Sequence, residues 1–242
     1  TDGQLGNGTQ DNVYEPQNLS GMFPFDPFET VGKVFAGMDH TFVMSSTGRI
    51  FAFGKNTWGQ LGTGDTDPHL VPLDITDALG LDPDELVTDM SAGTTHSMAV
   101  TDKVTVLVWG YNHRGQLGNG TTTGSSLPID ITGMFPLDAS DKIVSVDAGS
   151  SFSVAVSDQG RVFTWGMNNE GQLGNGTKDN RSIPFEITLA IPFLEGESVE
   201  MLETGSAHVT LLTTQGRVFA WGSSSRGQVG NNTAYGDIVF PV

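Results

Sequence analysis

Gly-Gln-Leu-Gly-Asn-Gly at residues 171–176, preceded by Trp165-Gly166, is the stretch that decides the fold of this chain. The same pattern recurs with small substitutions, and its leading glycines are Gly3, Gly59, Gly115, Gly171 and Gly227, each 56 residues after the last. The aromatic residues that precede four of the copies are Phe53, Trp109, Trp165 and Trp221. A constant period of this length indicates repeated supersecondary units. We therefore expect one repeat domain over 1–242, with units at 3–58, 59–114, 115–170 and 171–226 and a partial unit at 227–242.

Each unit contains about four short strand-forming stretches separated by turn signals. The expected strands include those that begin at one repeat position, namely 40–44, 96–100, 152–156 and 208–212, and those that end at the aromatic residue, such as 161–165. Val162-Phe163-Thr164-Trp165 is apolar at nearly every position, so this strand must be covered on both faces. The segments around Pro16, Pro72, Pro128 and Pro184 suit edge strands, and 76–86 could hold a helical turn. Four-stranded units packed face to face around an axis make an all-β propeller.

The recurring residues have expected places in such a fold. Glycines let the chain turn sharply where blades meet, and the leucines at 61, 117 and 173 fill the gap between blades. A buried tryptophan such as Trp165 contributes a large apolar area to this contact. The glutamines at 60, 116, 172 and 228 are expected to satisfy backbone groups between blades with both halves of the amide.

These residues resemble the regulator of chromosome condensation repeat family. The family's histidine-centred signature is matched by Met90-Ser91-Ala92-Gly93-Thr94-Thr95-His96-Ser97-Met98-Ala99-Val100, and the aromatic-Gly and GQLG elements match four or five times. The resemblance covers essentially the whole chain, and the repeats look like bacterial-type propeller repeats similar to alpha-tubulin-suppressor-like proteins. Phe152 departs from the signature histidine in the third unit, and Phe53 departs from the tryptophan in the first.

The resemblance implies a seven-bladed ring, whereas about four units are present. Residues 3–18 and 227–242 represent the same part of the repeat, apart from a one-residue slip that places Pro241 late. If the two termini shared one blade to close a ring, the chain would contain that part of the repeat only once. We therefore expect an arc of a larger ring, with a closed four-bladed ring as the alternative.

The net charge of the chain limits the kinds of partner that it can bind. Eleven basic and 28 acidic residues give a net charge of −17, which repels phosphate backbones and argues against nucleic-acid binding. No apolar run approaches the length of a membrane span, so membrane insertion is not expected. There are no cysteines, which excludes disulfides and thiolate chemistry. We expect a protein partner, with a basic one favoured by charge, and an extracellular or bacterial cell-surface location over a cytoplasmic one.

No catalytic residue, metal site or cofactor is expected. His40, His96 and His208 share one repeat position and could suggest metal ligands, but Phe152 holds that position in the third unit. The histidines are better explained as structural residues that start a strand and bond nearby backbone. No Asp-x-Asp-x-Asp-Gly loop, nucleophile elbow, phosphate loop or HExxH motif is present. Asn-Gly-Thr at 7–9, 119–121 and 175–177 matches the glycosylation sequon, but turn chemistry is the better explanation, because Asn-Gly favours tight turns.

The stretch between each aromatic-Gly pair and the following GQLG varies most in chemistry while its length stays constant. We call the stretches 55–58, 111–114, 167–170 and 223–226 the variable loops. Equivalent loops emerge on one face of a propeller, and aromatic, arginine and methionine side chains favour interface centres. The candidate partner-binding residues are Trp58, Tyr111, His113, Arg114, Met167 and Arg226, with unselected loop variation as the alternative.

The sequence thus predicts a non-catalytic protein-binding scaffold. The family resemblance implies two alternatives: guanine-nucleotide exchange on a small GTPase, or secreted inhibition of an extracellular enzyme such as a β-lactamase. A structural or cell-surface role is a third alternative, because fold does not fix function.

Overall fold

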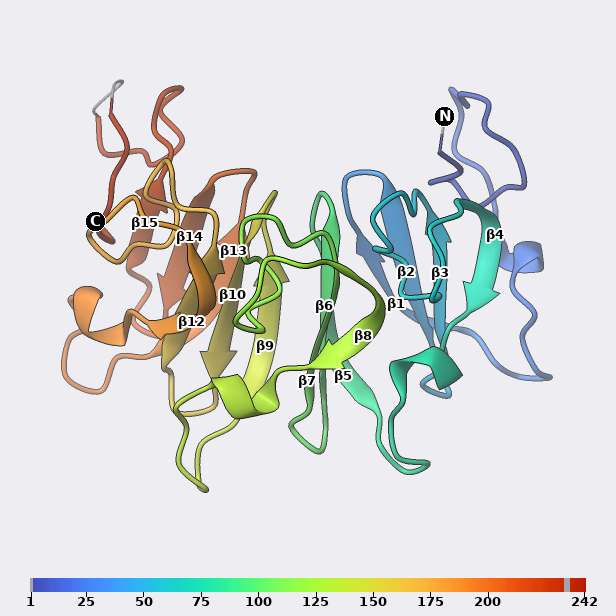
Figure 1. Cartoon of the computed structure of the whole chain (residues 1–242), viewed down its shortest axis with the longest axis horizontal. Helices are drawn as coiled ribbons and strands as arrows, with labels where there is room; N and C mark the ends of the chain where they lie inside the picture. Colours follow the sequence, from blue (N-terminus) through green and yellow to red (C-terminus); the bar gives the residue numbers. More distant parts are fainter. Residues whose placement is uncertain (1, 233–235) are drawn as a thin grey trace.

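The computed structural model describes residues 2–232 and 236–242, and its strands form four antiparallel sheets that we call blades 1 to 4. The elements of each blade are as follows. Blade 1 contains β1 (Val31–Ala36), β2 (His40–Ser45), β3 (Ile50–Gly54) and β4 (His69–Asp74), and blade 2 contains β5 (Val87–Ala92), β6 (His96–Thr101), β7 (Val106–Gly110) and β8 (Ser125–Asp130). Blade 3 contains β9 (Ile143–Ala148), β10 (Phe152–Ser157), β11 (Val162–Gly166) and β12 (Arg181–Glu186), and blade 4 contains β13 (Val199–Thr204), β14 (His208–Thr213) and β15 (Val218–Gly222). The blades lie side by side in chain order, with blade 1 at one end of the molecule and blade 4 at the other (Figure 1).

Short 3-10 helices precede blade 1 and lie in the three connections between blades. These are η1 (Ser20–Met22), η2 (Asp77–Leu79), η3 (Thr132–Met134) and η4 (Thr188–Ala190), and η2 confirms the helical turn predicted within 76–86. None of the helices in the described part of the chain has the length and apolar character that a membrane crossing needs.

The strands that end in the aromatic-Gly pair form the covered centre of each blade. Every residue of β3, β7 and β11 is buried, which confirms the prediction of a strand covered on both faces. Each pairs with the preceding strand through its final glycine, for example His40 with Gly54. Pro72, Pro128 and Pro184 lie in β4, β8 and β12, which are edge strands as predicted. The same prediction is wrong for the segment around Pro16, which forms no strand and joins none of the four sheets. Each blade takes its fourth strand from beyond the next GQLG copy, so the blades are offset from the repeat units.

The end of the chain takes the place of a fourth strand in blade 4. Ile238 pairs with Gly222, and Ala220 and Val242 exchange two backbone hydrogen bonds. In blade 3 the equivalent glycine, Gly166, pairs with Arg181, so the 56-residue repeat would pair Gly222 with Asp237. The observed partner, Ile238, is one residue later, which is the same shift as the slip at Pro241. Residues 233–235 of the partial unit 227–242 lie outside the described residues.

Each GQLG copy docks on the blade that follows it. The indole Nε1 of Trp109 donates to the carbonyl of Gln60 at 2.8 Å, and Trp165 and Trp221 do the same to Gln116 and Gln172 at 2.9 and 3.0 Å. Gly118 must be glycine, because its φ is +71° and a Cβ there would lie 2.6 Å from Nε1 of Trp165. The leucines at 61, 117 and 173 are fully buried in the same contact, as predicted.

The prediction for the glutamine side chains is wrong. Oε1 of Gln60 accepts from the backbone N–H of Trp58 in its own loop, and Gln116 and Gln172 repeat this bond. Nε2 of Gln60 and of Gln116 has no partner among the described residues. The amide side chain is too close to its own loop to span the blades, so the main-chain carbonyl of the glutamine makes the contact to the next blade.

The two ends of the array differ in what they contact. The first copy, 3–8, docks on blade 1, where Gly8 N–H donates to the carbonyl of Leu70 at 2.8 Å just as Gly64 donates to Ser126 at 2.9 Å. At the last copy, a Cβ on Gly227 or Gly230 would meet nothing within 4 Å. The four blades therefore form an open arc of a propeller.

Candidate protein-binding face

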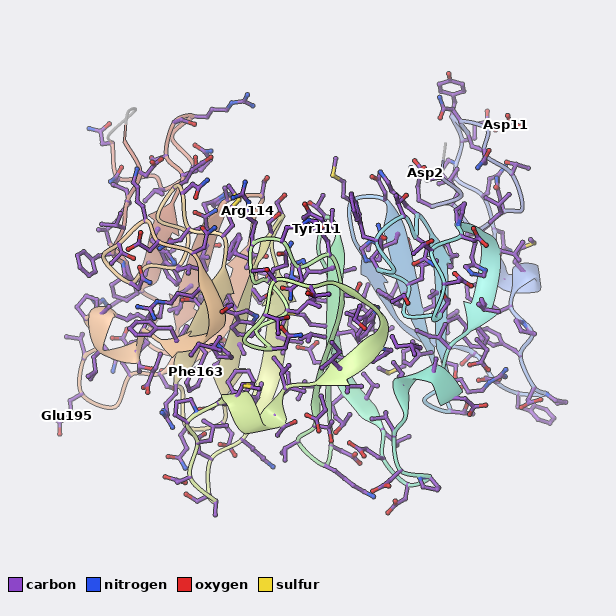
Figure 2. All side chains as sticks on the ribbon, in the orientation of Figure 1. Asp2, Asp11, Tyr111, Arg114, Phe163 and Glu195 are labelled. Carbon is purple, nitrogen blue, oxygen red and sulfur yellow. The ribbon has the colours of Figure 1, made fainter. Side chains whose placement is uncertain are left out.

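The variable loops emerge at one end of the blades. Figure 2 shows Tyr111 and Arg114 at this end, and Glu195 at the opposite end, where the hairpins between second and third strands also lie. We call the first the loop face and the second the hairpin face. The structure therefore places the predicted partner-binding residues of neighbouring units on the same side of the molecule.

Three aromatic rings gather at the centre of the loop face. The ring of Trp58 lies 4.5 Å from that of Tyr111 with an interplanar angle of 53°, and Tyr111 lies 4.6 Å from His113 at 84°. The side chain of Trp58 is 43% exposed. We call these three residues the aromatic cluster. It joins blades 1 and 2, because its members come from two successive variable loops.

The other predicted residues extend the face along the arc. Arg114 and Met167 hold the repeat positions of Trp58 and Tyr111 at the junction of blades 2 and 3; Arg114 is exposed and Met167 is half-buried. Arg226 is exposed on the last variable loop, and its backbone N–H donates to Gln228 at 2.7 Å. Lys55 is paired with Asp39 at 3.3 Å, so its charge is already partly compensated.

A buried asparagine holds each of the first three variable loops. Asn56, Asn112 and Asn168 are fully buried, and the Oδ1 of each accepts the backbone N–H of the leucine five residues later, at 2.9 to 3.0 Å. The Nδ2 groups donate to the following turn, as from Asn112 to the carbonyl of Thr123 at 2.9 Å. Sequence reasoning did not identify these residues, although asparagine recurs at a fixed place within otherwise variable loops. They hold the loop backbone in a single geometry, which lowers the ordering cost of binding.

The Asn-Gly-Thr turns behave as turn chemistry predicts. The Oδ1 atoms of Asn7, Asn119 and Asn175 each accept the backbone N–H two residues later, at 3.1 Å. The glycines that follow have positive φ.

The histidines lie between blades and do not bond nearby backbone, contrary to the prediction. His40 and His96 are buried, and their Nε2 atoms lie 2.9 and 2.8 Å from the hydroxyls of Ser97 and Ser153 on the next blade. Burial lowers the pKa of His40 to about 4 and that of His96 to about 3, so both are neutral near pH 7. The serine hydroxyls in turn donate at 2.8 Å to the glutamine carbonyls that also accept the tryptophans.

The hairpin face is stabilised by ion pairs. Arg49, Arg161 and Arg217 share one repeat position and pair with the buried carboxylates of Glu29, Asp141 and Glu197 at 2.8, 3.2 and 2.9 Å. Hydrogen bonds from Ser45 and Thr47, together with Arg49, lower the pKa of Glu29 to about 2. In the described part of the chain, no group of three or more histidine, aspartate or glutamate side chains has metal-binding geometry.

Comparison with known proteins decides the family. A sequence profile described as the regulator of chromosome condensation (RCC1) repeat matches residues 47–100, 105–156 and 159–212, and a second profile of the same repeat matches 87–116, 143–172 and 202–228. The chain belongs to the regulator of chromosome condensation repeat family. The matched RCC1 repeats run from β3 of blade 1 to β15 of blade 4.

The chain is similar in sequence to parts of several longer proteins with different functions in their names. The chain is 31% identical over 234 residues to the human E3 ubiquitin-protein ligase HERC2, covering 96% of this chain and 4% of that protein. It is 31% identical over 231 residues to the ultraviolet-B receptor UVR8 of Arabidopsis thaliana, covering 95% and 49%. The chain therefore spans about half of UVR8 and a small part of HERC2.

Solved structures confirm the propeller fold. Human WBSCR16 superposes with a TM-score of 0.74 at 23% identity, covering 90% of this chain and 53% of that one. Yeast RCC1 (Prp20), in its structure bound to Kap60, gives 0.71 at 19% identity, covering 87% and 48%. At this level of sequence identity, the structural similarity establishes the fold alone.

Proposed function

We propose that this chain is a non-catalytic protein-binding scaffold that engages its partner through the loop face, centred on the aromatic cluster. The observation that carries the proposal is the contact between Trp58, Tyr111 and His113 on two loops whose backbones are held by buried asparagines. Large aromatic side chains on a rigid support are the residues that contribute most at protein interfaces.

The proposed role is binding because the recurrent histidines are enclosed between blades. The imidazoles of His40 and His96 face serine hydroxyls inside the blade contacts, and burial keeps them neutral. A neutral, enclosed imidazole with a structural partner is poorly placed for proton transfer to a substrate. The net charge of −17 attracts a basic partner at long range and repels nucleic acid.

Relatives support protein binding in general terms. The published structures of Prp20 concern a complex with Kap60 and binding to Gsp1p and histones, all of which are proteins. Exchange on a GTPase is not carried over to this chain, because Prp20 is only 19 to 22% identical to it. A nucleotide-release assay with small GTPases distinguishes that activity from simple binding.

The test compares binding with and without the aromatic cluster. A partner captured on the immobilised chain is purified, and its affinity is measured by calorimetry for the wild type and for Trp58→Ala/Tyr111→Ala. We expect a loss of about 30-fold or more, since two interface aromatics typically contribute at least 2 kcal/mol, and little change in melting temperature. Leu189→Ala, at a fully exposed side chain in η4, is the matched control and should bind as wild type. Unchanged affinity in a stable double variant would remove the loop face from consideration.

A further inference from the structure

The first strands of neighbouring blades lie next to one another, and the seams between them are not equivalent. Between blades 2 and 3 the seam is bridged at two levels. The carboxylate of Asp89 accepts the hydroxyl of Ser145 at 3.0 Å and the backbone N–H of Val146 at 3.2 Å. Ser91 donates to Asp147 at 2.7 Å and accepts the backbone N–H of Ala148 at 3.0 Å.

The seam between blades 3 and 4 has only the second of these bridges. Asp147, at the repeat position of Ser91, accepts the backbone N–H of Thr204. At the other level Ser145 stands where Asp89 stood, and Met201 stands where Ser145 stood. The hydroxyl of Ser145 already donates its proton to Asp89, and methionine has no proton to donate, so the described residues form no bridge of the Asp89 kind at this level. A groove of about 340 Å³ opens at this point, towards the hairpin face.

The lining of this groove is acidic and partly apolar. Its carboxylates are Asp158, Glu200 and Glu203, and none of its lining residues is lysine or arginine. Burial, together with the nearby carboxylates of Asp147 and Asp89, raises the pKa of Glu203, so this negative charge is not compensated. Val144 and Met201 expose 41% and 54% of their surface at the same place.

We propose that this seam groove binds a lysine or arginine side chain from an extended basic segment of a protein partner. The aliphatic stem would lie on Val144 and Met201, and the cationic head would reach the carboxylates of Glu200 and Glu203. The chain itself shows that a lysine fits such a seam. Lys33 in blade 1 holds the repeat position that Ser145 holds in blade 3. Its Nζ donates across the seam between blades 1 and 2 to the carbonyl of Thr88 at 2.9 Å.

This groove is a second surface, towards the other end of the molecule from the aromatic cluster, and it does not rest on the loop-face proposal. The two can be tested separately, because Trp58→Ala/Tyr111→Ala leaves every residue of the groove in place.

The probe is a short fluorescein-labelled peptide that alternates lysine and glycine. It is titrated with the full chain at an ionic strength of about 0.15 M, where the Debye length is about 8 Å, and binding is followed by fluorescence anisotropy. Glu200→Gln/Glu203→Gln should weaken binding about tenfold, the size expected for two partly exposed ion pairs. Asp11→Asn/Glu15→Gln removes the same charge from the exposed N-terminal segment and should change the affinity less than about twofold, because distant exposed charges are screened. Trp58→Ala/Tyr111→Ala should bind the peptide as wild type.

A further variant separates docking in the groove from general attraction to an acidic protein. Met201→Trp fills the groove with a larger side chain and leaves the net charge unchanged. The proposal predicts a weaker complex, by about fivefold or more, because the groove is closed. Tighter binding by this variant would overturn the proposal, as would equal affinity for all variants or failure of the peptide to bind the wild type.

Discussion

The imidazole Nε2 of His40 lies 2.9 Å from the hydroxyl of Ser97, a residue 57 positions later on the neighbouring blade. The hydroxyl donates onward to the carbonyl of Gln60, which also accepts the indole of Trp109. His96 and Ser153 repeat this arrangement between blades 2 and 3. Where Phe152 replaces the histidine, Val209 replaces the serine, and both are buried in one apolar cluster. The chain thus contains a polar and an apolar version of the same blade contact.

This pairing predicts strong coupling between the two positions. Ser97→Val leaves the Nε2 of His40 without a buried partner and removes one of the two hydrogen bonds to the carbonyl of Gln60, so it should lower the free energy of unfolding by about 1–3 kcal/mol. His40→Phe/Ser97→Val copies the natural Phe152–Val209 pair and should cost less than the sum of the single changes, by about 1–2 kcal/mol. Urea denaturation of the four proteins measures the coupling, and strictly additive costs would show that the two side chains do not interact.

The two buried histidines predict a loss of stability in mild acid. Because folding lowers their pKa values from about 6.5 to about 4 and about 3, the folded state binds fewer protons than the unfolded state. Their contribution is complete above pH 6.5 and is lost as the pH falls towards the folded values, at about 1.4 kcal/mol per pH unit for each histidine. Urea denaturation between pH 7 and pH 5 measures this slope.

The control for that experiment is His40→Phe/Ser97→Val, in which the slope should fall by about half. The window stops at pH 5 because carboxylates such as Glu29, with a pKa lowered to about 2, lose their contribution at lower pH. An unchanged slope in the control variant would mean that other groups cause the pH dependence.

The tryptophan at each blade contact should be a major source of stability. Trp165 is fully buried and donates to Gln116, so Trp165→Ala should cost about 3–5 kcal/mol in chemical denaturation. Trp58→Ala, at a half-exposed ring, should cost much less. A loss below about 1 kcal/mol for Trp165→Ala would contradict its place in the core.

Glycines at equivalent positions separate backbone strain from blade packing. Gly118 and Gly230 both have a φ of +71°, but a Cβ on Gly118 meets Trp165 at 2.6 Å whereas one on Gly230 meets nothing. Gly230→Ala should therefore cost only the strain of the left-handed backbone, about 1–2 kcal/mol. Gly118→Ala should cost about 1–3 kcal/mol more in thermal or urea denaturation. Equal costs would show that the loop is not pressed against the next blade.

Much of the fold could be predicted because the repeat is regular. The fixed spacing of Gly59, Gly115 and Gly171 and the mostly apolar strands such as 162–165 predicted covered blades. The one-residue slip at Pro241 was visible in the sequence, but the shifted pairing of Gly222 that follows from it was not predicted. The partner of His40 was missed because it lies in another unit, although the joint change to Phe152 and Val209 was a readable signal. The glutamine amides were misassigned because the main chain, which carries no sequence signal, makes the contact.

The candidate sites were predictable to a lesser degree. Loop position identified the neighbourhood of Trp58 and Tyr111, but the contact between their rings depends on how closely two blades approach. The seam groove exists where Ser145 and Met201 form no hydrogen bond between blades 3 and 4. This difference is recognised only by comparison with the seam between blades 2 and 3, where Asp89 forms such a bond.

Site-specific photo-cross-linking tests the central claim, that a rigid arc of blades presents the loop face to a protein. Benzoylphenylalanine is placed at His113, beside Tyr111, or at Gln215, an exposed turn residue on the hairpin face. The account predicts that the partner is cross-linked from position 113 and not from position 215, and that Trp58→Ala abolishes the product. Equal products from both positions, or a product from position 215 alone, would contradict it.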